Sequence, residues 1–569
     1  MRRSLLGLRA TAATSLVVAT VSIAALATSC GDGNPGFDPP ANELAFPSGL
    51  MLDPRVSTEP SGPCITDDDC EGDQLCGGGD QCREPARWLF AINANSDRRF
   101  NAGSMLALDL DRFWEAAFGD PSAILSAGAA LSPDSDAYNW AEDSGVCGSS
   151  GAQAKAKQGQ WCRRVANTPQ MVECLEEPFV CSESTVHFGT FPGPAAAWDV
   201  DPSDNEAMLL IPVRGDPSVT YVEISGTGDD LRLDCGSDPG HDGSRYCDDD
   251  HRLRFLDNDP ELTRLAREPF RVLVSPQPDL PLAYVSHQGD PDFTLLALEG
   301  IDSDEIQRPA IVHQANLLVI DGASLAYQGG FGLAQRPCDV DSGNAPSRTN
   351  GCSRPLVYSA LRWTPYVNVM TAITHPQVPD ADASEAACVP DDDADISCVP
   401  QAEPVKDFAV GALSTANVPL STSRPILADV AFSRTGNELY VLQSNPGGLL
   451  RIDTSIGPDG ETIDLPAGQV EVCSQPTTLA VYDDGDNEYG LVTCYRSGEL
   501  FVVDLASLTV VGLSRAGIGP DTMTVDLARE VVYIANTLDA TISVIEMDPD
   551  SPARFTQIAR LGLQEPYVQ

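Results

Sequence analysis

The sequence predicts an all-β fold, a seven-bladed β-propeller with disulfide-stapled loop insertions. Three observations lead to this fold. A triplet of short strands recurs along most of the chain, a fourth strand often follows it, and many of the 17 cysteines lie in the long segments between strands. One triplet cannot bury both faces of its small sheet, so successive copies must pack side by side around an axis.

The clearest copy of the repeat spans residues 519–548, GPDTMTVDLAREVVYIANTLDATISVIEMD. It contains the runs MTVDL, VVYIAN and TISVIEMD, which are separated by an acidic turn and a short loop. Each run is rich in Val, Ile, Thr and Tyr and alternates apolar with polar or small residues. This alternation is typical of a half-buried strand.

Six further copies can be aligned on the second strand of the triplet. These second strands are LFAIN at 89–93, LLIPV at 209–213, YVS at 284–286, LVYSALRW at 356–363, YVL at 440–442 and LVTC at 491–494. The pattern also predicts first strands at 48–54, 426–433 and 476–484, and fourth strands at 508–514 and 555–561. A β-sandwich or two smaller β-domains are the alternative, but such folds do not repeat a strand triplet seven times.

The repeat resembles that of the YVTN-repeat, or YncE-like, seven-bladed propeller lipoproteins of Gram-negative bacteria. Tyr533-Ile534-Ala535-Asn536 stands where that family has Tyr-Val-Thr-Asn, and Thr541-Ile542-Ser543-Val544-Ile545 matches its third strand. The resemblance covers residues 45–562 with interruptions, and it is weakest at the fourth unit. It implies a propeller fold and is nearly silent about function.

The N-terminus predicts export and lipid attachment. Arg2 and Arg3 precede an uncharged stretch from Ala10 to Ser29, and small residues lead into Cys30. This pattern indicates a lipoprotein-type signal peptide with lipidation at Cys30, and the Gly/Pro-rich segment that follows is typical of a tether. A retained membrane helix is the alternative, because 20 uncharged residues can just span a bilayer.

These observations give the expected organisation and location. The expected segments are a signal peptide at 1–29, a tether at 30–44, the propeller at 45–562 and a tail at 563–569, with Cys-rich insertions at about 55–87, 112–186, 227–266, 336–354 and 374–404. We expect an exported protein anchored in the bacterial cell envelope. The outer membrane or cell surface is favoured over the inner membrane.

The cysteines predict disulfides, because export leads to an oxidising compartment and sixteen cysteines remain besides Cys30. Cys473 and Cys494 are predicted to pair, since both lie at strand ends on one face of neighbouring blades. The other expected pairs join nearby cysteines within each insertion. Cys64, Cys70, Cys76 and Cys82 recur every six residues in a loop between the first and second strands of blade one. Zinc is the alternative there, although the spacing is not that of a zinc finger.

Charge and motif content limit the possible partners and cofactors. The formal net charge of −48 argues against nucleic acid as a partner and against membrane contact other than through the lipid. No Cys-x-x-Cys-His haem motif, Gly-x-Ser-x-Gly elbow or phosphate loop occurs in the sequence. No cofactor is therefore expected, but Ca²⁺ in the Asp-rich loops at 67–73, 234–243 and 483–488 stays open.

One set of residues points to a ligand. The loops between second and third strands share one face of a propeller, and four of them carry arginine while a fifth carries histidine. The candidate ligand-binding residues are Arg98, Arg99, Arg214, His287, Arg362 and Arg496. Convergent arginines suit carboxylate or phosphate groups. The alternative is that each arginine neutralises a nearby aspartate, such as Asp97 or Asp216.

The sequence thus favours a non-catalytic binding or scaffolding module of the cell envelope. Its expected partner is an envelope protein, a glycan or an anionic small molecule. The alternative is a lactonase-like hydrolase that acts in the central channel. A third hypothesis is that the insertions dock the protein to a larger envelope assembly. No catalytic residue can be matched from the sequence, and the oligomeric state is not indicated.

Overall fold

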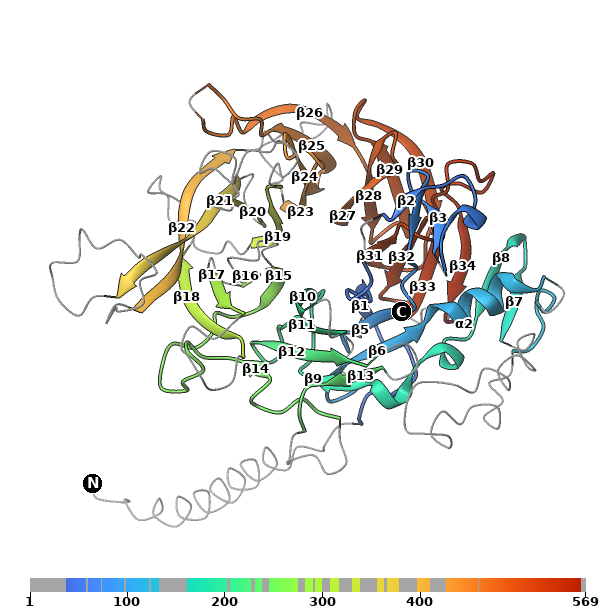
Figure 1. Ribbon diagram of the computed structural model, residues 1–569, viewed down its shortest axis with the longest axis horizontal. Coiled ribbons are helices and arrows are strands. Elements are labelled where there is room, and N and C mark those ends of the chain that lie inside the picture. The colour runs from blue at the N-terminus through green and yellow to red at the C-terminus, as the bar shows by residue number, and fades with distance from the viewer. Residues whose placement is uncertain are drawn as a thin grey trace, which may run out of the picture.

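The described part of the chain contains seven sheets of four or more strands, arranged as blades around a central axis, and four successive strands of each sheet pair antiparallel (Figure 1). The structure is a computed structural model. It describes residues 37–563 apart from 58–59, 73, 97–98, 122–123, 132–160, 202–204, 227–230, 238–244, 275–281, 290–291, 299–307, 317–329, 338–355, 363–365, 378–396, 410–425 and 459. The fold is the expected seven-bladed β-propeller.

Within each blade the four strands follow the chain order from the axis outward. Blades one to three consist of β1 (Pro47–Leu52), β5 (Trp88–Asn93), β6 (Gly103–Asp109) and β9 (Val186–Phe188); β10 (Ala196–Asp201), β11 (Glu206–Val213), β12 (Ser218–Ser225) and β13 (Arg232–Asp234), with β14 (Arg252–Leu253) also paired to β12; and β15 (Pro269–Val274), β16 (Leu282–His287), β17 (Asp292–Ala297) and β18 (Ala310–Asn316).

Blades four to seven repeat this order. Their strands are β19 (Gly330–Gln335), β20 (Val357–Leu361), β21 (Tyr366–Gln377) and β22 (Ser397–Ala409); β23 (Ile426–Phe432), β24 (Glu438–Asn445), β25 (Gly447–Asp453) and β26 (Leu465–Glu471); β27 (Pro476–Asp483), β28 (Glu488–Cys494), β29 (Glu499–Asp504) and β30 (Thr509–Arg515); and β31 (Pro520–Asp526), β32 (Val531–Asn536), β33 (Thr541–Glu546) and β34 (Gln557–Leu561).

The hydrophobic core is divided among the junctions between blades. Seven clusters of buried apolar side chains occur in the described residues, and each joins two successive blades. The cluster between blades seven and one includes Leu89, Leu106, Tyr533 and Val544, so the last blade packs directly against the first. The Thr537 hydroxyl also donates a hydrogen bond of 2.8 Å to the Pro47 carbonyl across this junction.

The second-strand tyrosines explain why the repeat is so recognisable. Tyr284, Tyr358, Tyr440 and Tyr533 are buried, and each packs in the cluster shared with the next blade. Burial of such a large side chain supplies much of the apolar area that one blade removes from water on its neighbour. Three of the four hydroxyls also form hydrogen bonds; that of Tyr358 donates to Asp464 Oδ1 at 3.1 Å, that of Tyr440 donates to Glu438 Oε2 at 2.6 Å, and that of Tyr533 accepts from Trp114 Nε1 at 2.9 Å.

The asparagine that ends the second strand has a different role. Asn536 Oδ1 accepts a hydrogen bond of 2.8 Å from the Gly517 amide, and Asn93 Oδ1 accepts one of 3.0 Å from the Ala45 amide. In both blades the side chain holds the connection that leads into the first strand. The asparagine thus satisfies backbone groups that no sheet neighbour would reach.

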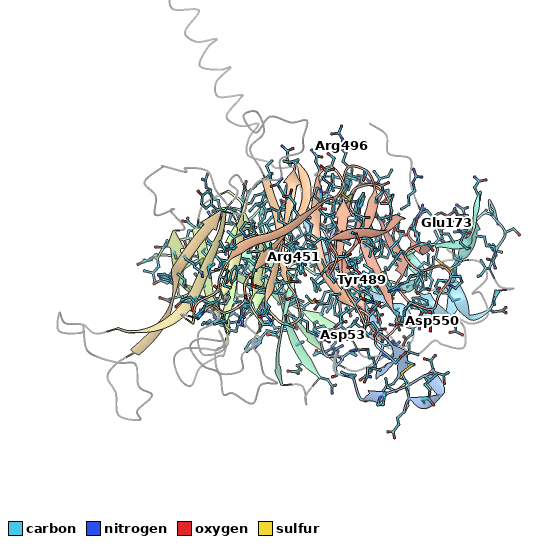
Figure 2. All side chains as sticks on the ribbon, turned by 90° about the horizontal axis from the view of Figure 1, so that it is seen from above. Asp53, Glu173, Arg451, Tyr489, Arg496 and Asp550 are labelled. Atoms are coloured by element: carbon cyan, nitrogen blue, oxygen red, sulfur yellow. A yellow bond between two sulfur atoms is a disulfide. The ribbon has the colours of Figure 1, made fainter. Side chains whose placement is uncertain are left out.

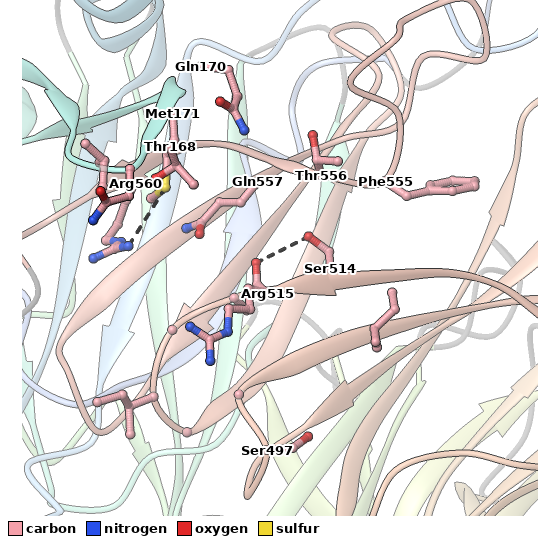
Figure 3. Close-up of a pocket in the computed structure, with 18 of the residues that line it drawn as sticks. Thr168, Gln170, Met171, Ser497, Ser514, Arg515, Phe555, Thr556, Gln557 and Arg560 are labelled. Atoms are coloured by element: carbon pink, nitrogen blue, oxygen red, sulfur yellow. Dashed lines mark hydrogen bonds between the residues drawn. The ribbon is translucent and has the colours of Figure 1, made fainter.

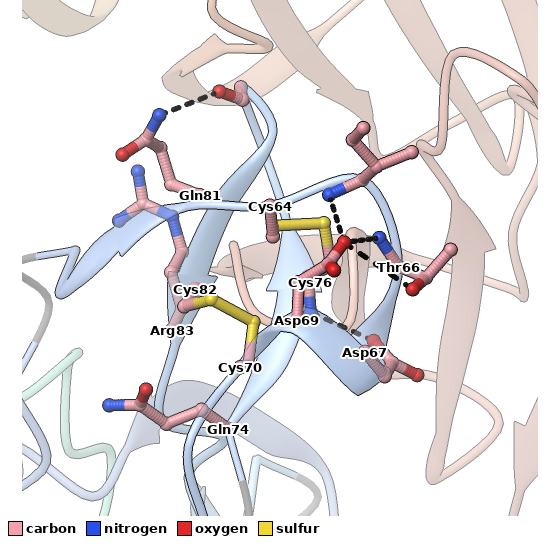
Figure 4. The surroundings of a disulfide bond; sticks show 12 residues. Cys64, Thr66, Asp67, Asp69, Cys70, Gln74, Cys76, Gln81, Cys82 and Arg83 are labelled. Atoms are coloured by element: carbon pink, nitrogen blue, oxygen red, sulfur yellow. Dashed lines mark hydrogen bonds between the residues drawn. A yellow bond between two sulfur atoms is a disulfide. The ribbon is translucent and has the colours of Figure 1, made fainter.

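The first Cys-rich insertion lies between β1 and β5, as the sequence predicts. It contains β2 (Gly62–Pro63), η1 (Asp67–Asp69), β3 (Leu75–Gly77) and β4 (Gln81–Arg83). Cys64–Cys76 and Cys70–Cys82 cross-link it (Figure 4). The insertion rests on the first turn of blade seven, where the Gly78 amide donates to the Leu527 carbonyl at 2.9 Å.

The second insertion separates the third and fourth strands of blade one. It begins with α2 (Leu110–Trp114) and the π-helical turn η2 (Glu115–Gly119). Next come the hairpin β7 (Cys162–Val165) and β8 (Thr168–Cys174) and the turns η5 (Glu177–Phe179) and η6 (Ser182–Ser184). Strand β8 pairs in parallel with β34, so this hairpin covers the outer edge of blade seven.

Five disulfides lie in the described residues, and each joins cysteines close in sequence. The remaining three are Cys162–Cys174, Cys235–Cys247 and Cys473–Cys494. Cys181 is also disulfide-bonded, whereas Cys147, Cys338, Cys352 and Cys388 lie outside the described residues.

Two of the expected insertion boundaries differ from the structure. The stretch 227–266 supplies β13 as the fourth strand of blade two, and the stretch 374–404 contains the end of β21 and most of β22. Strand β13 is only three residues long, which is too short for an alternating pattern to show. Strand β22 has prolines and charged residues where an outer strand can tolerate them.

No helix within the described residues is long and apolar enough to cross a membrane. The predicted signal peptide, Cys30 and the first part of the tether lie outside these residues, as does almost all of the C-terminal tail.

Candidate anion-binding site at the channel mouth

A cavity of about 760 Å³ lies at one end of the propeller axis. All seven blades contribute to its wall, through the beginnings of their first strands or the loops between their second and third strands. These segments share one face, because the antiparallel order puts the start of strand one beside the end of strand two. Figure 2 labels Arg496 near this face and Asp53, which follows β1, near the opposite one.

Three of the predicted arginines, from three different blades, line this cavity: Arg214, Arg362 and Arg496. Arg214 follows β11 and is half-buried. Its Nε donates to the Phe191 carbonyl at 3.2 Å and its Nη1 donates to Gln288 Oε1 of blade three at 3.2 Å. These contacts fix the guanidinium without a salt bridge to Asp216, whose carboxylate lies 3.7 Å from Arg252 instead.

Aromatic rings support two of these guanidinium groups. The Arg214 guanidinium carbon lies 5.5 Å from the ring centroid of Phe270, and that of Arg362 lies 4.5 Å from the ring centroid of Phe331. The two rings meet edge to face, with centroids 4.4 Å apart. Such stacking orients a guanidinium and keeps its charge.

Burial lowers the pKa of both the Arg214 and Arg362 guanidinium groups from the ordinary value, although nearby carboxylates oppose the shift. Asp521 and Glu268 are the acidic neighbours of Arg214, and Glu268 is that of Arg362. Arginine keeps its proton at neutral pH under such shifts. The cavity therefore carries fixed positive charge in a strongly acidic protein.

A fourth arginine, Arg271 of β15, lies in the cavity wall. Its Nη2 is 2.9 Å from Asp429 Oδ2 of β23, and this carboxylate is buried. A second carboxylate, that of Asp521, lines the cavity itself. Burial raises the pKa of the Asp521 carboxyl above its ordinary value, although the positive charges of Arg214 and Arg271 oppose the shift.

The other predicted ligand residues do not join this group. His287 is fully buried inside blade three, where its Nε2 lies 2.9 Å from Thr294 Oγ1, so the expectation that it faces the mouth is wrong. It occupies the last position of β16 and not the loop itself, because the strand is longer than its pattern indicates. Arg99 is exposed and lies over the Phe46 ring at 5.9 Å, outside the cavity lining. Arg98 lies outside the described residues.

The disulfide between Cys473 and Cys494 supports one wall of the cavity. Its Cα atoms are 6.0 Å apart, and it joins the end of blade five to the end of the second strand of blade six. The neighbouring residues Ser474 and Tyr495 both line the cavity. The cross-link therefore fixes two segments of the mouth relative to each other.

The sequence also contained a signal for cavity residues that the loop alignment missed. In six blades the second residue of the first strand lines the cavity, namely Ser48, Phe270, Phe331, Leu427, Thr477 and Asp521. Alignment of the repeats on the first strand, where four of these residues follow a proline, could have found them. The loops alone could not, because the wall of a propeller channel is built by its innermost strands.

Zinc at the clustered cysteines and Ca²⁺ in the Asp-rich loops were the two metal hypotheses from the sequence, and the contacts of these residues bear on both. In the described residues, the one cluster with metal-ligand proximity is Cys64, Cys70 and Cys82, and all three sulfurs are in disulfides. In the acidic loops, Asp69 Oδ2 accepts hydrogen bonds from the Ile65 and Thr66 amides. Asp484 likewise accepts from the Asn487 amide and pairs with Arg554 at 2.7 Å. These carboxylates stabilise their own turns.

Comparison with known proteins finds solved structures of similar fold. No family model and no curated protein matches the chain. Similar solved structures include the periplasmic gluconolactonase PpgL of Pseudomonas aeruginosa, which is 11% identical with a TM-score of 0.36, covering 77% of this chain and 84% of that one. A proposed 6-phosphogluconolactonase of Bacteroides uniformis is 9% identical with a TM-score of 0.36, covering 63% and 84%. The Cps50 (Swd1) propeller domain of Myceliophteria thermophila is 8% identical with a TM-score of 0.39, covering 88% and 96%. Similarity at this level does not identify a function.

Proposed function

We propose that this protein is an exported, lipid-anchored binding module that holds an anionic small molecule or glycan end at the mouth of its propeller channel. The observation that carries the proposal is the presence of Arg214, Arg271, Arg362 and Arg496 in the lining of one cavity. The chain as a whole is strongly acidic, with 83 Asp and Glu against 35 Lys and Arg. A cavity with four arginines and one carboxylate in its lining is the place where such a protein can accept an anion.

The cell-envelope location is part of the same proposal. The five disulfides are typical of proteins that fold outside the cytoplasm. The signal-peptide pattern and Cys30 supply the anchor, and the Gly/Pro-rich segment after it supplies the tether.

A calorimetric titration tests the binding site. Galacturonate, glucuronate and glucose 6-phosphate are titrated against the disulfide-intact protein, with glucose as the neutral control. Arg214→Ala is expected to lower the affinity for the anionic sugars by roughly 10- to 100-fold, because a hydrogen bond to a charged group contributes about 1.5–3 kcal/mol. Arg214→Lys is also expected to weaken binding, since lysine lacks the planar fork and the stacking face.

Arg434 offers a matched control on the other face of the propeller. It lies in the turn between β23 and β24, its side chain is 75% exposed, and it forms a surface ion pair with Asp483. Arg434→Ala should leave the affinity unchanged, while added salt should weaken the binding of every anion. Equal affinity in wild type and Arg214→Ala would contradict the site, as would equal affinity for glucose and galacturonate.

Lactone hydrolysis in the same cavity is the second candidate. The observation in its favour is the half-buried Asp521 carboxyl beside arginines, since a carboxyl with a raised pKa in a cavity suits general acid or base catalysis. The test is acid release from a sugar lactone at constant pH, compared between wild type and Asp521→Asn. Turnover that Asp521→Asn abolishes without loss of anion binding would favour the enzyme.

A further inference from the structure

A second cavity, of about 640 Å³, lies outward from the channel between blades six and seven (Figure 3). The end of β30 and the segment after it form one side, and the hairpin β7–β8 and strand β34 form the other. The hairpin reaches this position because β8 extends the sheet of blade seven beyond β34. The insertion in blade one therefore builds a wall that a plain propeller would lack.

The lining of this outer cavity has a distinct composition. It contains Arg496, Arg515 and Arg560 and no carboxylate among the lining residues. Besides the arginines, seven lining residues carry an amide or a hydroxyl: Asn167, Thr168, Gln170, Ser497, Ser514, Thr556 and Gln557. The remaining lining residues are apolar or glycine and include one aromatic ring, that of Phe555. A carboxylate-free lining is unexpected by chance in a chain with more than twice as many acidic as basic residues.

Two of these arginines, Arg560 and Arg515, differ in how firmly their side chains are held. Arg560 is 8% exposed, its Nη1 lies 3.9 Å from Glu173 Oε2, and its Nη2 contacts the Met171 sulfur. Arg515 is exposed at the end of β30. A ligand can therefore meet one anchored and one adjustable guanidinium group in this cavity.

The outer cavity adjoins the channel mouth. Arg496 lines both cavities, and two chain segments, 495–498 and 518–522, pass from one lining to the other. The two linings together contain six arginines and a single carboxylate, that of Asp521. The arginines are Arg214, Arg271, Arg362, Arg496, Arg515 and Arg560.

We infer that the channel mouth is one end of an extended groove that binds a linear acidic oligosaccharide, with carboxylates on several successive units. This inference rests on the proposed anion site and adds the length and chemical class of its ligand. Carboxylates of the chain pair with successive arginines. The hydroxyl groups of the sugar units bond to the amide and hydroxyl side chains between them, and one sugar face packs on Phe555.

Chain length is the variable that tests the groove. Galacturonate monomer and oligogalacturonates of two to eight units are titrated against the disulfide-intact protein, with maltohexaose as a neutral chain and hexaglutamate as an acidic peptide. The affinity is expected to rise at least tenfold from monomer to hexamer, because each added contact joins a ligand that is already bound. Maltohexaose should bind far more weakly than the acidic hexamer.

A variant in the outer cavity separates the groove from the channel site. Arg515→Gln is expected to reduce the ratio of hexamer to monomer affinity by about fivefold or more, whereas Arg214→Ala weakens both ligands. Arg434→Gln is the control of equal charge change on the opposite face and should leave the ratio unchanged. Circular dichroism in the near ultraviolet checks that each variant keeps its fold.

The outcomes distinguish this inference from the proposed function. If the monomer binds through Arg214 but chain length and Arg515→Gln have no effect on affinity, the groove is refuted and the channel site stands. If neither monomer nor hexamer binds, the anion site itself fails. If hexaglutamate binds as tightly as the sugar hexamer and responds equally to Arg515→Gln, the ligand class is wrong and an acidic peptide replaces it.

Discussion

Replacement of Asp429 should lower the stability of the propeller strongly, because this one side chain contacts residues of several blades. Its carboxylate is buried, and it accepts hydrogen bonds from Arg271 Nη2 of blade three at 2.9 Å and from the Leu479 amide of blade six at 3.1 Å. Its other oxygen accepts from the Val430 amide at 3.0 Å. Gly332 of blade four packs so closely that a Cβ there would lie 2.5 Å from this carboxylate, so four blades meet at one residue.

The size of the effect follows from these contacts. In Asp429→Ala the Leu479 amide loses a charged acceptor in a buried setting, which costs about 1.5–3 kcal/mol. The Arg271 side chain is 23% exposed and can regain water, so loss of that ion pair adds only about 1 kcal/mol. We expect the free energy of unfolding to fall by about 2.5–4 kcal/mol. The burial of Asp429, which raises the pKa of its carboxyl, limits the net contribution of the pair.

The assay is equilibrium unfolding in urea with the disulfides intact, followed by both tryptophan fluorescence and far-ultraviolet circular dichroism. Coincident transitions justify a single free energy for a protein of this size. Asp483→Ala is the matched control, because Asp483 also pairs with an arginine, Arg434, at 2.9 Å but on the surface. The control should change stability by less than about 1 kcal/mol. Equal effects of Asp429→Ala and Asp483→Ala would refute the role of the buried carboxylate.

Three other predictions concern charge and the anchor. Burial raises the pKa of the Asp521 carboxyl, so its protonation at falling pH makes the cavity more positive and should raise the affinity of the wild type for a sulfated sugar. Asp521→Asn should bind this sugar roughly fivefold more tightly than the wild type at pH 7.5, with little pH dependence. A steep pH profile in the variant would contradict this. Burial raises the pKa of Glu530 to about 7, helped by the charges of Asp548 and Glu546. Between about pH 4.5 and 7 the folded state therefore binds more protons than the unfolded state, so the free energy of unfolding falls as the pH rises through that range. Glu530→Gln removes this titration and should stabilise the protein by roughly 1–2 kcal/mol at pH 8 but not at pH 4. Urea titrations at both pH values measure it, and equal stability of variant and wild type at pH 8 would exclude it. Cys30→Ser should release the protein from the membrane fraction or leave the precursor uncut, and a processed variant that still fractionates with membranes would show that the anchor is elsewhere.

Much of the fold could be predicted from short stretches of sequence. Short runs of apolar and small residues were enough to locate the second strand of every blade, because these strands are buried on both faces between neighbouring sheets. Tyr533 and Asn536 show why the repeat carries this signal: the tyrosine fills the junction with the next blade, and the asparagine holds the segment that enters its own blade. The Cys473–Cys494 bond followed from strand order alone, because antiparallel order fixes which strand ends share a face.

The candidate site depended on tertiary structure to a much greater extent. Loop position brought Arg214, Arg362 and Arg496 into consideration, but it also included His287, which a longer strand carries into the interior of blade three. Periodicity gives the face of a side chain and cannot tell whether a strand ends one residue earlier or later.

The innermost strands and the blade-one hairpin were decided by tertiary structure alone. Asp521 and Arg271 belong to the site because the first strands of blades three and seven, which are about 250 residues apart in sequence, converge at one axis. The outer cavity exists because β8 pairs with β34 at the far end of the chain. The sequence by itself determined which segments form strands, since that depends on neighbours a few residues away. The packing of the seven blades around one axis decided which arginines and carboxylates lie close together, because these residues come from segments that no local sequence pattern connects.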